Sequence, residues 1–165
     1  MDALQSTVMS WLQSQLSPAW ALFWMFVTGF VGATILPLPL GSEAILLWVT
    51  QQLPAWTWAA VAVGTLGNAL GSLSNCWLGL WLRQRPSGER AEAWLEKHLD
   101  PRAVRWLEKH GAPLLFFSWV PVIGDPCCVA AGWLRVPIAQ ATVWIVLGKL
   151  FRYSALVLGA RYWVG

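Results

Sequence analysis

The sequence predicts an all-α integral membrane protein with two re-entrant, broken-helix hairpins, about three full transmembrane helices and amphipathic surface helices. Its 165 residues are 57% hydrophobic and 12% charged, whereas roughly 25% of the residues in a soluble domain are charged. No charged residue occurs from Ala3 to Ser42 or from Ala44 to Leu82. Two apolar stretches are also interrupted by prolines and an acid. These observations predict a single membrane domain over residues 1–165.

The clearest interruption lies in residues 119–133, where Pro121, Gly124, Asp125 and Pro126 stand in an otherwise apolar stretch. Each proline removes a backbone donor and clashes with the preceding helical turn. We expect a break here, followed by a new helix with Asp125 as its N-cap and Pro126 as its first residue. Irregular backbone at membrane depth is tolerated only where protein or a wet cavity covers it. The sequence therefore places an acid inside the membrane, where ionisable groups usually have a function.

A similar interruption occurs in the first half of the chain. Residues 18–36 are apolar and close to the ~20 residues needed to cross a bilayer. The segment Pro37–Leu–Pro39 then breaks this stretch. Gly41 or Ser42 is suited to cap a short helix that starts at Glu43 and runs to about residue 52. An acid again stands at the start of a half-helix.

The N-terminal residues 1–17 form a separate polar segment with apolar residues at helical spacing. A short helix on the membrane surface and a frayed tail both fit this pattern. The segment has no cationic region and no small-residue cleavage site, so we do not expect a removable signal peptide.

Two later stretches, residues 55–82 and 138–160, are long enough to span. The first contains several glycines and serines, which let helices approach closely, and two amides, Asn68 and Asn75, that either join helices or belong to a site. The second carries Lys149 and Arg152 on one helix face. Long cations can snorkel to the membrane surface, but Lys149 lies about midway along its stretch. Paired cations at this depth need partners, and the intramembrane acids offer them.

Residues 83–110 differ in kind, because they hold seven of the eleven cations and five acids. Two short amphipathic helices are predicted here, the first capped by Ser87 and the second running from Asp100–Pro101 to a C-terminal cap at Gly111. The excess of cations assigns this loop to the cytoplasmic side.

No metal site or cofactor is predicted. The two histidines, His98 and His110, fit a solvated surface better than a metal site. The cysteines Cys76, Cys127 and Cys128 stand in apolar surroundings and fit small packing residues.

Residues 18–82 and 111–161 resemble each other, since each has a broken segment with an acid at a half-helix start and then a glycine-containing span. Such paired interruptions are typical of transporters built from inverted repeats. Half-helix N-termini favour anions such as phosphate, although the acids there are also suited simply to cap these helices.

Four motifs in this chain resemble the YqaA branch of the DedA family, which shares the VTT domain of SNARE-associated Golgi-type proteins. They are Gly67–Asn–Ala–Leu–Gly–Ser–Leu–Ser–Asn75, Trp119–Val–Pro–Val–Ile–Gly–Asp125, Ala131–Gly–Trp133 and Gly148–Lys–Leu–Phe–Arg–Tyr153. The resemblance implies a multi-pass protein of the bacterial inner membrane with two re-entrant hairpins that face each other. It also implies flipping of undecaprenyl phosphate or scrambling of phospholipids, and a link to proton-motive-force homeostasis.

The chain departs from the family pattern in its charges. Glu43 matches the family acid after Pro-x-Pro, but Ser72 stands where a second acid is usual. Ser118 and Gly124 stand where the family has an arginine pair. Asp125, Lys149 and Arg152 are the candidates to supply that charge set from other positions.

We therefore predict a transporter of an anionic lipid headgroup. Lys149 and Arg152 would bind the phosphate, and Glu43 and Asp125 would hold the cations apart or exchange protons. Asn68 and Asn75 are further candidates. The alternative is a proton- or ion-coupled transporter of small solutes that acts in membrane-potential homeostasis.

An enzyme is not expected, because the intramembrane segments contain no His and no nucleophile–base pair. The expected partners are membrane lipids, and binding to nucleic acid is not expected. The sequence leaves open whether the protein forms a homo-oligomer.

Overall fold

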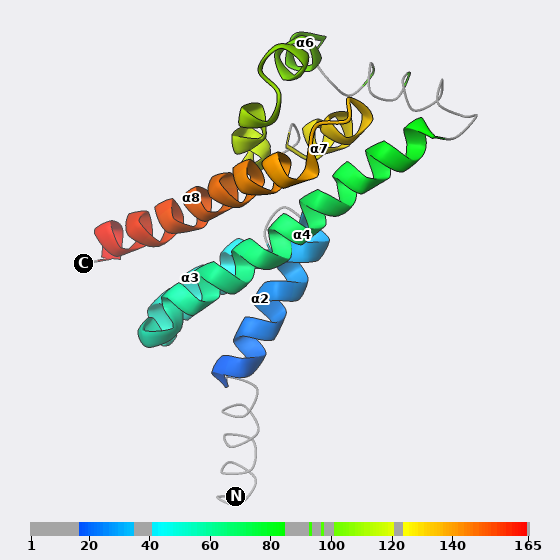
Figure 1. The fold of residues 1–165 in the computed structure, drawn as a ribbon. Coiled ribbons are helices and arrows are strands. Elements are labelled where there is room, and N and C mark those ends of the chain that lie inside the picture. Colours follow the sequence, from blue (N-terminus) through cyan, green and yellow to red (C-terminus); the bar gives the residue numbers. More distant parts are fainter. Residues whose placement is uncertain are drawn as a thin grey trace, which may run out of the picture.

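The computed structural model describes residues 17–34, 41–84, 101–120 and 124–164, together with Ala93 and Lys97. These residues form helices and no strand, which confirms the all-α class. Figure 1 shows their arrangement as long helices with shorter helices packed between them. In chain order the elements are α2 (Pro18–Gly32), α3 (Gly41–Gln52), η1 (Pro54–Trp56), α4 (Thr57–Arg83), α6 (Pro101–His110), η2 (Ala112–Trp119), α7 (Gly124–Trp133) and α8 (Ile138–Val164).

The helix boundaries follow the local chemistry of the sequence. Ser17 caps α2 by accepting a hydrogen bond from the Trp20 backbone N–H at 3.5 Å. Gly111 follows the last residue of α6 with a φ of 65°, a conformation that glycine adopts without strain. The predicted second helix of residues 83–110 is therefore confirmed, whereas the predicted first helix and Ser87 lie outside the described residues. The N-terminal segment 1–16 and the prolines at 37 and 39 lie outside them as well.

Both interruptions are present, but their details differ from the prediction. The helix α7 begins at Gly124, so Asp125 lies in its first turn rather than at its N-cap. In the same way α3 begins at Gly41, and Glu43 lies in its first turn. The arm before the second interruption, η2, is a 3-10 helix rather than an α-helix. The last helix also continues beyond residue 160, to Val164.

Glycines set the close contacts between helices. A Cβ added to Gly67 or Gly71 of α4 would collide with backbone carbonyls of α2. A Cβ on Gly79 of α4 or on Gly132 of α7 would collide with the backbone of the other helix, and one on Gly148 of α8 would meet a carbonyl of η2. The prediction that small residues bring these helices together is confirmed.

The helices pack in a reciprocal pattern. The arm before each interruption packs against the long helix that follows it, α2 against α4 and η2 against α8. The short helix after each interruption also packs against the long helix of the other half, α3 against α8 and α7 against α4. The helices α4 and α8 contact each other directly and run antiparallel (Figure 1). The helices on either side of each interruption therefore pack against the same pair of long helices, α4 and α8.

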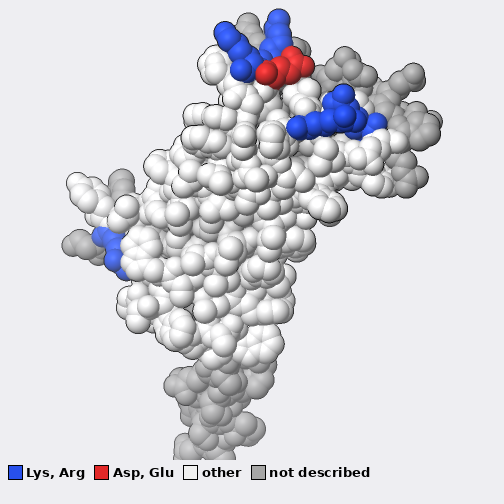
Figure 2. Space-filling model, in the orientation of Figure 1, with Lys and Arg blue, Asp and Glu red and all other residues white. Residues whose placement is uncertain are grey.

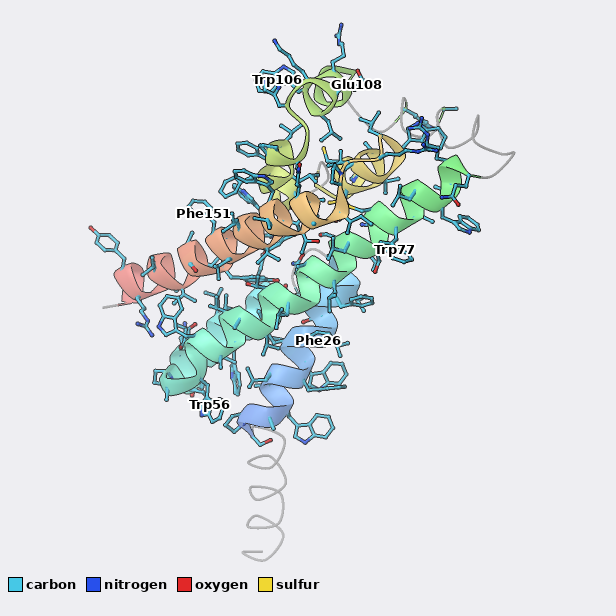
Figure 3. All side chains as sticks on the ribbon, viewed as in Figure 1. Phe26, Trp56, Trp77, Trp106, Glu108 and Phe151 are labelled. Carbon is cyan, nitrogen blue, oxygen red and sulfur yellow. The ribbon has the colours of Figure 1, made fainter. Side chains whose placement is uncertain are left out.

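The outer surface carries many large apolar side chains. Trp77 of α4 is 67% exposed and points outward, and Figure 3 places Trp56 and Trp106 near opposite ends of the molecule. Figure 2 shows charged residues collected at the end where α6 lies and again near the C-terminal end of α8, with an uncharged surface between them. This distribution suits a bilayer, whose aqueous boundaries accept charge and whose interior does not.

By length and composition, one helix within the described residues is suited to cross a membrane, Ile138–Tyr162 within α8. The helix α4 has 27 residues, which corresponds to a length of about 40 Å, but polar residues lower its hydropathy. The expected number of about three full transmembrane spans therefore stays a prediction.

Candidate functional site

An ion pair joins the first interrupted segment to the last long helix. Nη2 of Arg152, from the middle of α8, contacts Oε1 of Glu43 in the first turn of α3, and each side chain is 22% exposed. The other terminal nitrogen, Nη1, donates to the Trp119 carbonyl oxygen at the end of η2, at 3.0 Å. One guanidinium thus bridges the start of α3 and the end of η2, which uses the fork geometry that distinguishes arginine from lysine.

Lys149 lies one turn earlier on the same face of α8 and is buried, with 3% of its surface exposed. Its Nζ donates to the Ser118 carbonyl oxygen at 3.1 Å, also at the end of η2. The last carbonyls of a helix lack partners within that helix and form its negative end, so both cations have a physical reason to be there. Lys149 therefore turns into the protein and does not snorkel to the surface.

The two acids lie near different cations. Asp125, at the start of α7, interacts electrostatically with Lys149. Within the described residues no direct ion pair joins them, and the acid that contacts Arg152 is Glu43. The expectation that Asp125 neighbours at least one cation is met by Lys149, while Arg152 is bound from the other interrupted segment.

A chain of hydrogen bonds runs beside this ion pair. The Asn68 Nδ2 of α4 donates to the Tyr153 hydroxyl oxygen at 2.9 Å, and the Tyr153 hydroxyl donates to Ser42 Oγ at 3.0 Å. Tyr153 is fully buried and Ser42 precedes Glu43, so the chain ties α4, α8 and α3 together next to the charges. Sequence reasoning missed Tyr153 as a site residue, although it ends the motif that contains both cations.

Asn75 lies elsewhere. Its Nδ2 donates to the Ala33 carbonyl oxygen at 2.9 Å, just beyond the end of α2. This bond satisfies a carbonyl at a helix end and fixes α2 to α4, which is the helix-joining role of an intramembrane amide. The structure thus brings Glu43, Lys149, Arg152 and Asn68 into one polar cluster with Asp125 beside it, and places Asn75 at the α2–α4 contact.

Within the described ranges, no group of three or more His, Cys, Asp or Glu side chains is placed to hold a metal ion. The cysteines Cys76, Cys127 and Cys128 are free and buried. The described cluster offers charge pairing and hydrogen bonding.

Comparison with known proteins identifies the family. The inner membrane protein YqaA of Escherichia coli is 36% identical over 155 residues, which cover 90% of this chain and 99% of that protein. The chain belongs to the YqaA family. The inner membrane protein YqaA of Shigella flexneri is also 36% identical to this chain over 155 residues. A protein of Haemophilus influenzae is 30% identical over 159 residues, which cover 91% of this chain and 94% of the Haemophilus protein. No family model and no solved structure matches the chain.

Membership in the YqaA family confirms the resemblance drawn from the four sequence motifs. It also gives the location, because the YqaA relatives are inner membrane proteins of bacteria. The apolar surface between the charged ends of the molecule is therefore the surface that meets lipid, and the polar cluster lies inside a membrane protein.

Proposed function

We propose that this protein moves the headgroup of an anionic lipid, such as undecaprenyl phosphate or a phospholipid, across the bacterial inner membrane while the lipid tail stays in the bilayer. The observation that carries the proposal is the Glu43–Arg152 ion pair, with Lys149 one turn away, at a guanidinium that contacts both interrupted segments. Charged groups inside a membrane protein are costly and usually mark a substrate or ion pathway.

The proposal includes an architecture of two re-entrant hairpins related by an inverted repeat. The reciprocal packing supports it, because α3 packs on α8 while α7 packs on α4. An inverted repeat produces such an exchange, since each half then presents the same surfaces to the other. Transporters with this organisation place their substrate at the interface of the repeats, near the middle of the membrane.

Arg152 is the residue that we expect to recognise the phosphate. In the described structure its two terminal nitrogens hold a carboxylate and a carbonyl oxygen, and a phosphate offers two oxygens to the same fork. Glu43 then occupies the place of the substrate in its absence and leaves Arg152 when the phosphate binds. Lys149 has donors beyond the one used on Ser118 and would contact the same headgroup.

Charge balance links this exchange to protons. The two cations and two acids of the cluster sum to zero, so an added phosphate leaves an excess of negative charge. Because uncompensated charge at membrane depth costs several kcal/mol, about 3 on insertion scales, protonation of Glu43 or Asp125 would restore neutrality. The acids therefore serve as proton acceptors that accompany the headgroup. We infer no chemical conversion of the lipid.

Reconstitution tests this function directly. Purified protein in liposomes that carry fluorescent anionic lipids, including a polyprenyl phosphate, should expose inner-leaflet headgroups to an impermeant quencher faster than protein-free liposomes. Arg152→Lys should abolish the gain, while Ser74→Ala, at an exposed position of α4, should retain it. Absence of flipping with every lipid, together with proton-driven flux of a small ion, would replace this function by that of a solute transporter.

A further inference from the structure

Three polar groups on one face of α4 lack partners. Thr65 Oγ1, Asn68 Oδ1 and Ser72 Oγ are buried and have no hydrogen-bond partner among the described residues. The three residues are 4%, 6% and 0% exposed. They stand at positions i, i+3 and i+7, so they share a face of the helix. A buried polar group without a partner costs free energy of folding and calls for an explanation.

Other hydroxyls in the same protein show that these groups had an alternative. A helical Ser or Thr can satisfy its hydroxyl on the carbonyl four residues earlier. That bond is made at 2.6–2.9 Å by Thr28, Thr50, Ser74 and Thr142. Ser74 makes it on α4 itself, two residues after Ser72. Thr65 and Ser72 do not make this bond, although both hydroxyls are buried.

The face that carries these groups looks toward α8. Asn68 bonds to Tyr153 of α8, and the two helices run antiparallel (Figure 1). Ser72 lies one helical turn after Asn68 on α4, and Lys149 lies one turn before Tyr153 on α8. Because the helices are antiparallel, both steps lead toward the same end of the helix pair. This places Ser72 at the level of the Lys149 side chain.

A further unpaired group lies at that level. Ser118 Oγ is buried and also lacks a partner among the described residues, and Lys149 binds the carbonyl of the same residue. The unpaired polar groups thus continue from Thr65 past Asn68 and Ser72 to Ser118, whose carbonyl binds Lys149.

The chemistry of the groups selects their ligand. Lys149 offers only donors, the Asn68 carbonyl oxygen only accepts, and the three hydroxyls do both. An anion would satisfy the donors alone, and a cation would satisfy the acceptors alone. Water satisfies all of them, and ordered water is the usual partner of buried polar groups that the protein itself leaves unpaired. We propose that Thr65, Asn68 and Ser72 bind a file of water molecules between α4 and α8 that reaches Lys149.

This file connects the two charged parts of the cluster. At one end it meets Lys149, which interacts with Asp125. At its middle Asn68 passes hydrogen bonds through Tyr153 to Ser42, the neighbour of Glu43. Water along α4 thereby hydrates the interior between the acids, which a dry core of packed side chains would not do.

Cysteine accessibility tests the water file in the full chain reconstituted in liposomes. A small cationic methanethiosulfonate reacts with thiolates, which form in water and not in hydrocarbon. Ser72→Cys should react at least about 10-fold faster than Ser74→Cys, whose position faces outward on the same helix. The wild-type protein, with its buried cysteines, sets the baseline. Equal rates for the two variants would overturn the proposal.

The unfolding midpoint is the second measurement. If Ser72→Cys does not fold, this measurement alone tests the proposal. A dry, unpaired hydroxyl destabilises the protein, so Thr65→Val and Ser72→Ala would raise the midpoint if the file were absent. With water bound, both variants should unfold at or below the wild-type midpoint, as we also expect for Ser74→Ala. A raised midpoint in both variants would overturn the proposal. Neither measurement uses lipid flipping, so failure of the transport function and failure of the water file are told apart.

Discussion

Glu43→Gln isolates the contribution of the ion pair at the centre of the molecule. The substitution keeps the size of the side chain and an oxygen that can accept a hydrogen bond, but it removes the charge. Arg152 then retains the Trp119 carbonyl and a neutral amide as partners. Since the guanidinium stays charged, its removal from water is no longer compensated by an acid.

The structure bounds the size of the effect. Two unit charges about 4 Å apart attract each other by about 4 kcal/mol at an effective dielectric constant of about 20. Breaking a fully buried pair costs about 3–5 kcal/mol, and an exposed pair contributes at most about 1 kcal/mol. Both partners here are 22% exposed, which lies between these limits. We expect Glu43→Gln to lower the free energy of unfolding by about 2 kcal/mol.

A double-mutant cycle with Arg152→Gln measures the pair itself. Unfolding of each variant in mixed micelles, by titration with a denaturing detergent, should give a coupling energy of about 1–2 kcal/mol. Glu108→Gln, at an exposed position of α6, should leave stability unchanged and serves as the control for loss of a carboxylate. A coupling below about 0.3 kcal/mol, the error of such cycles, would show that the pair contributes nothing. Wild-type flipping by Glu43→Gln would show that this acid has no part in transport.

Further substitutions test the neighbouring features. Arg152→Lys should insert normally but lose flipping, because one ammonium cannot hold two partners in fork geometry; measurable flipping by this variant would contradict the phosphate contact. Asp125→Asn should lower lipid flipping, because Lys149 loses the acid that lies near it, and unchanged flipping would remove the acid from the cluster. Gly148→Ala should cost about 1–3 kcal/mol by overpacking, whereas Gly159→Ala, in open space on the same helix, should raise stability by up to about 1 kcal/mol. Glu108→Cys should not react with an impermeant maleimide added to intact cells, because α6 is predicted to face the cytoplasm. Labelling from outside would show that the predicted orientation is wrong.

Sequence reasoning located the interruptions because proline and glycine act locally. Pro121 disfavours a continuous helix whatever surrounds it, and Asp125 is suited to the first turn of the next helix. The helical face shared by Lys149 and Arg152 likewise follows from their spacing. These features depend on a few neighbouring residues, so the sequence alone predicts them to within one or two positions.

The partners of the charges could not be predicted in the same way. Helical spacing states which residues share a face, but not which helix covers that face. The reciprocal packing brings Glu43 from the first half to Arg152 in the second, and the same packing makes Tyr153 the partner of Asn68. Asn75 looked equivalent to Asn68 along the sequence, yet it binds at the end of α2. Only the three-dimensional contacts distinguish the two amides.

The hydrogen bond between Asn68 and Tyr153 forms only after a delay during synthesis of the protein. The two residues are 85 positions apart, so at about 5–20 residues per second the ribosome needs roughly 4–17 s between them. During that interval α4 already carries its polar face, while the helix that supplies the tyrosine has not been made. The yield of folded protein therefore depends on what shields α4 in those seconds, and slowing translation between the two residues lengthens the exposure.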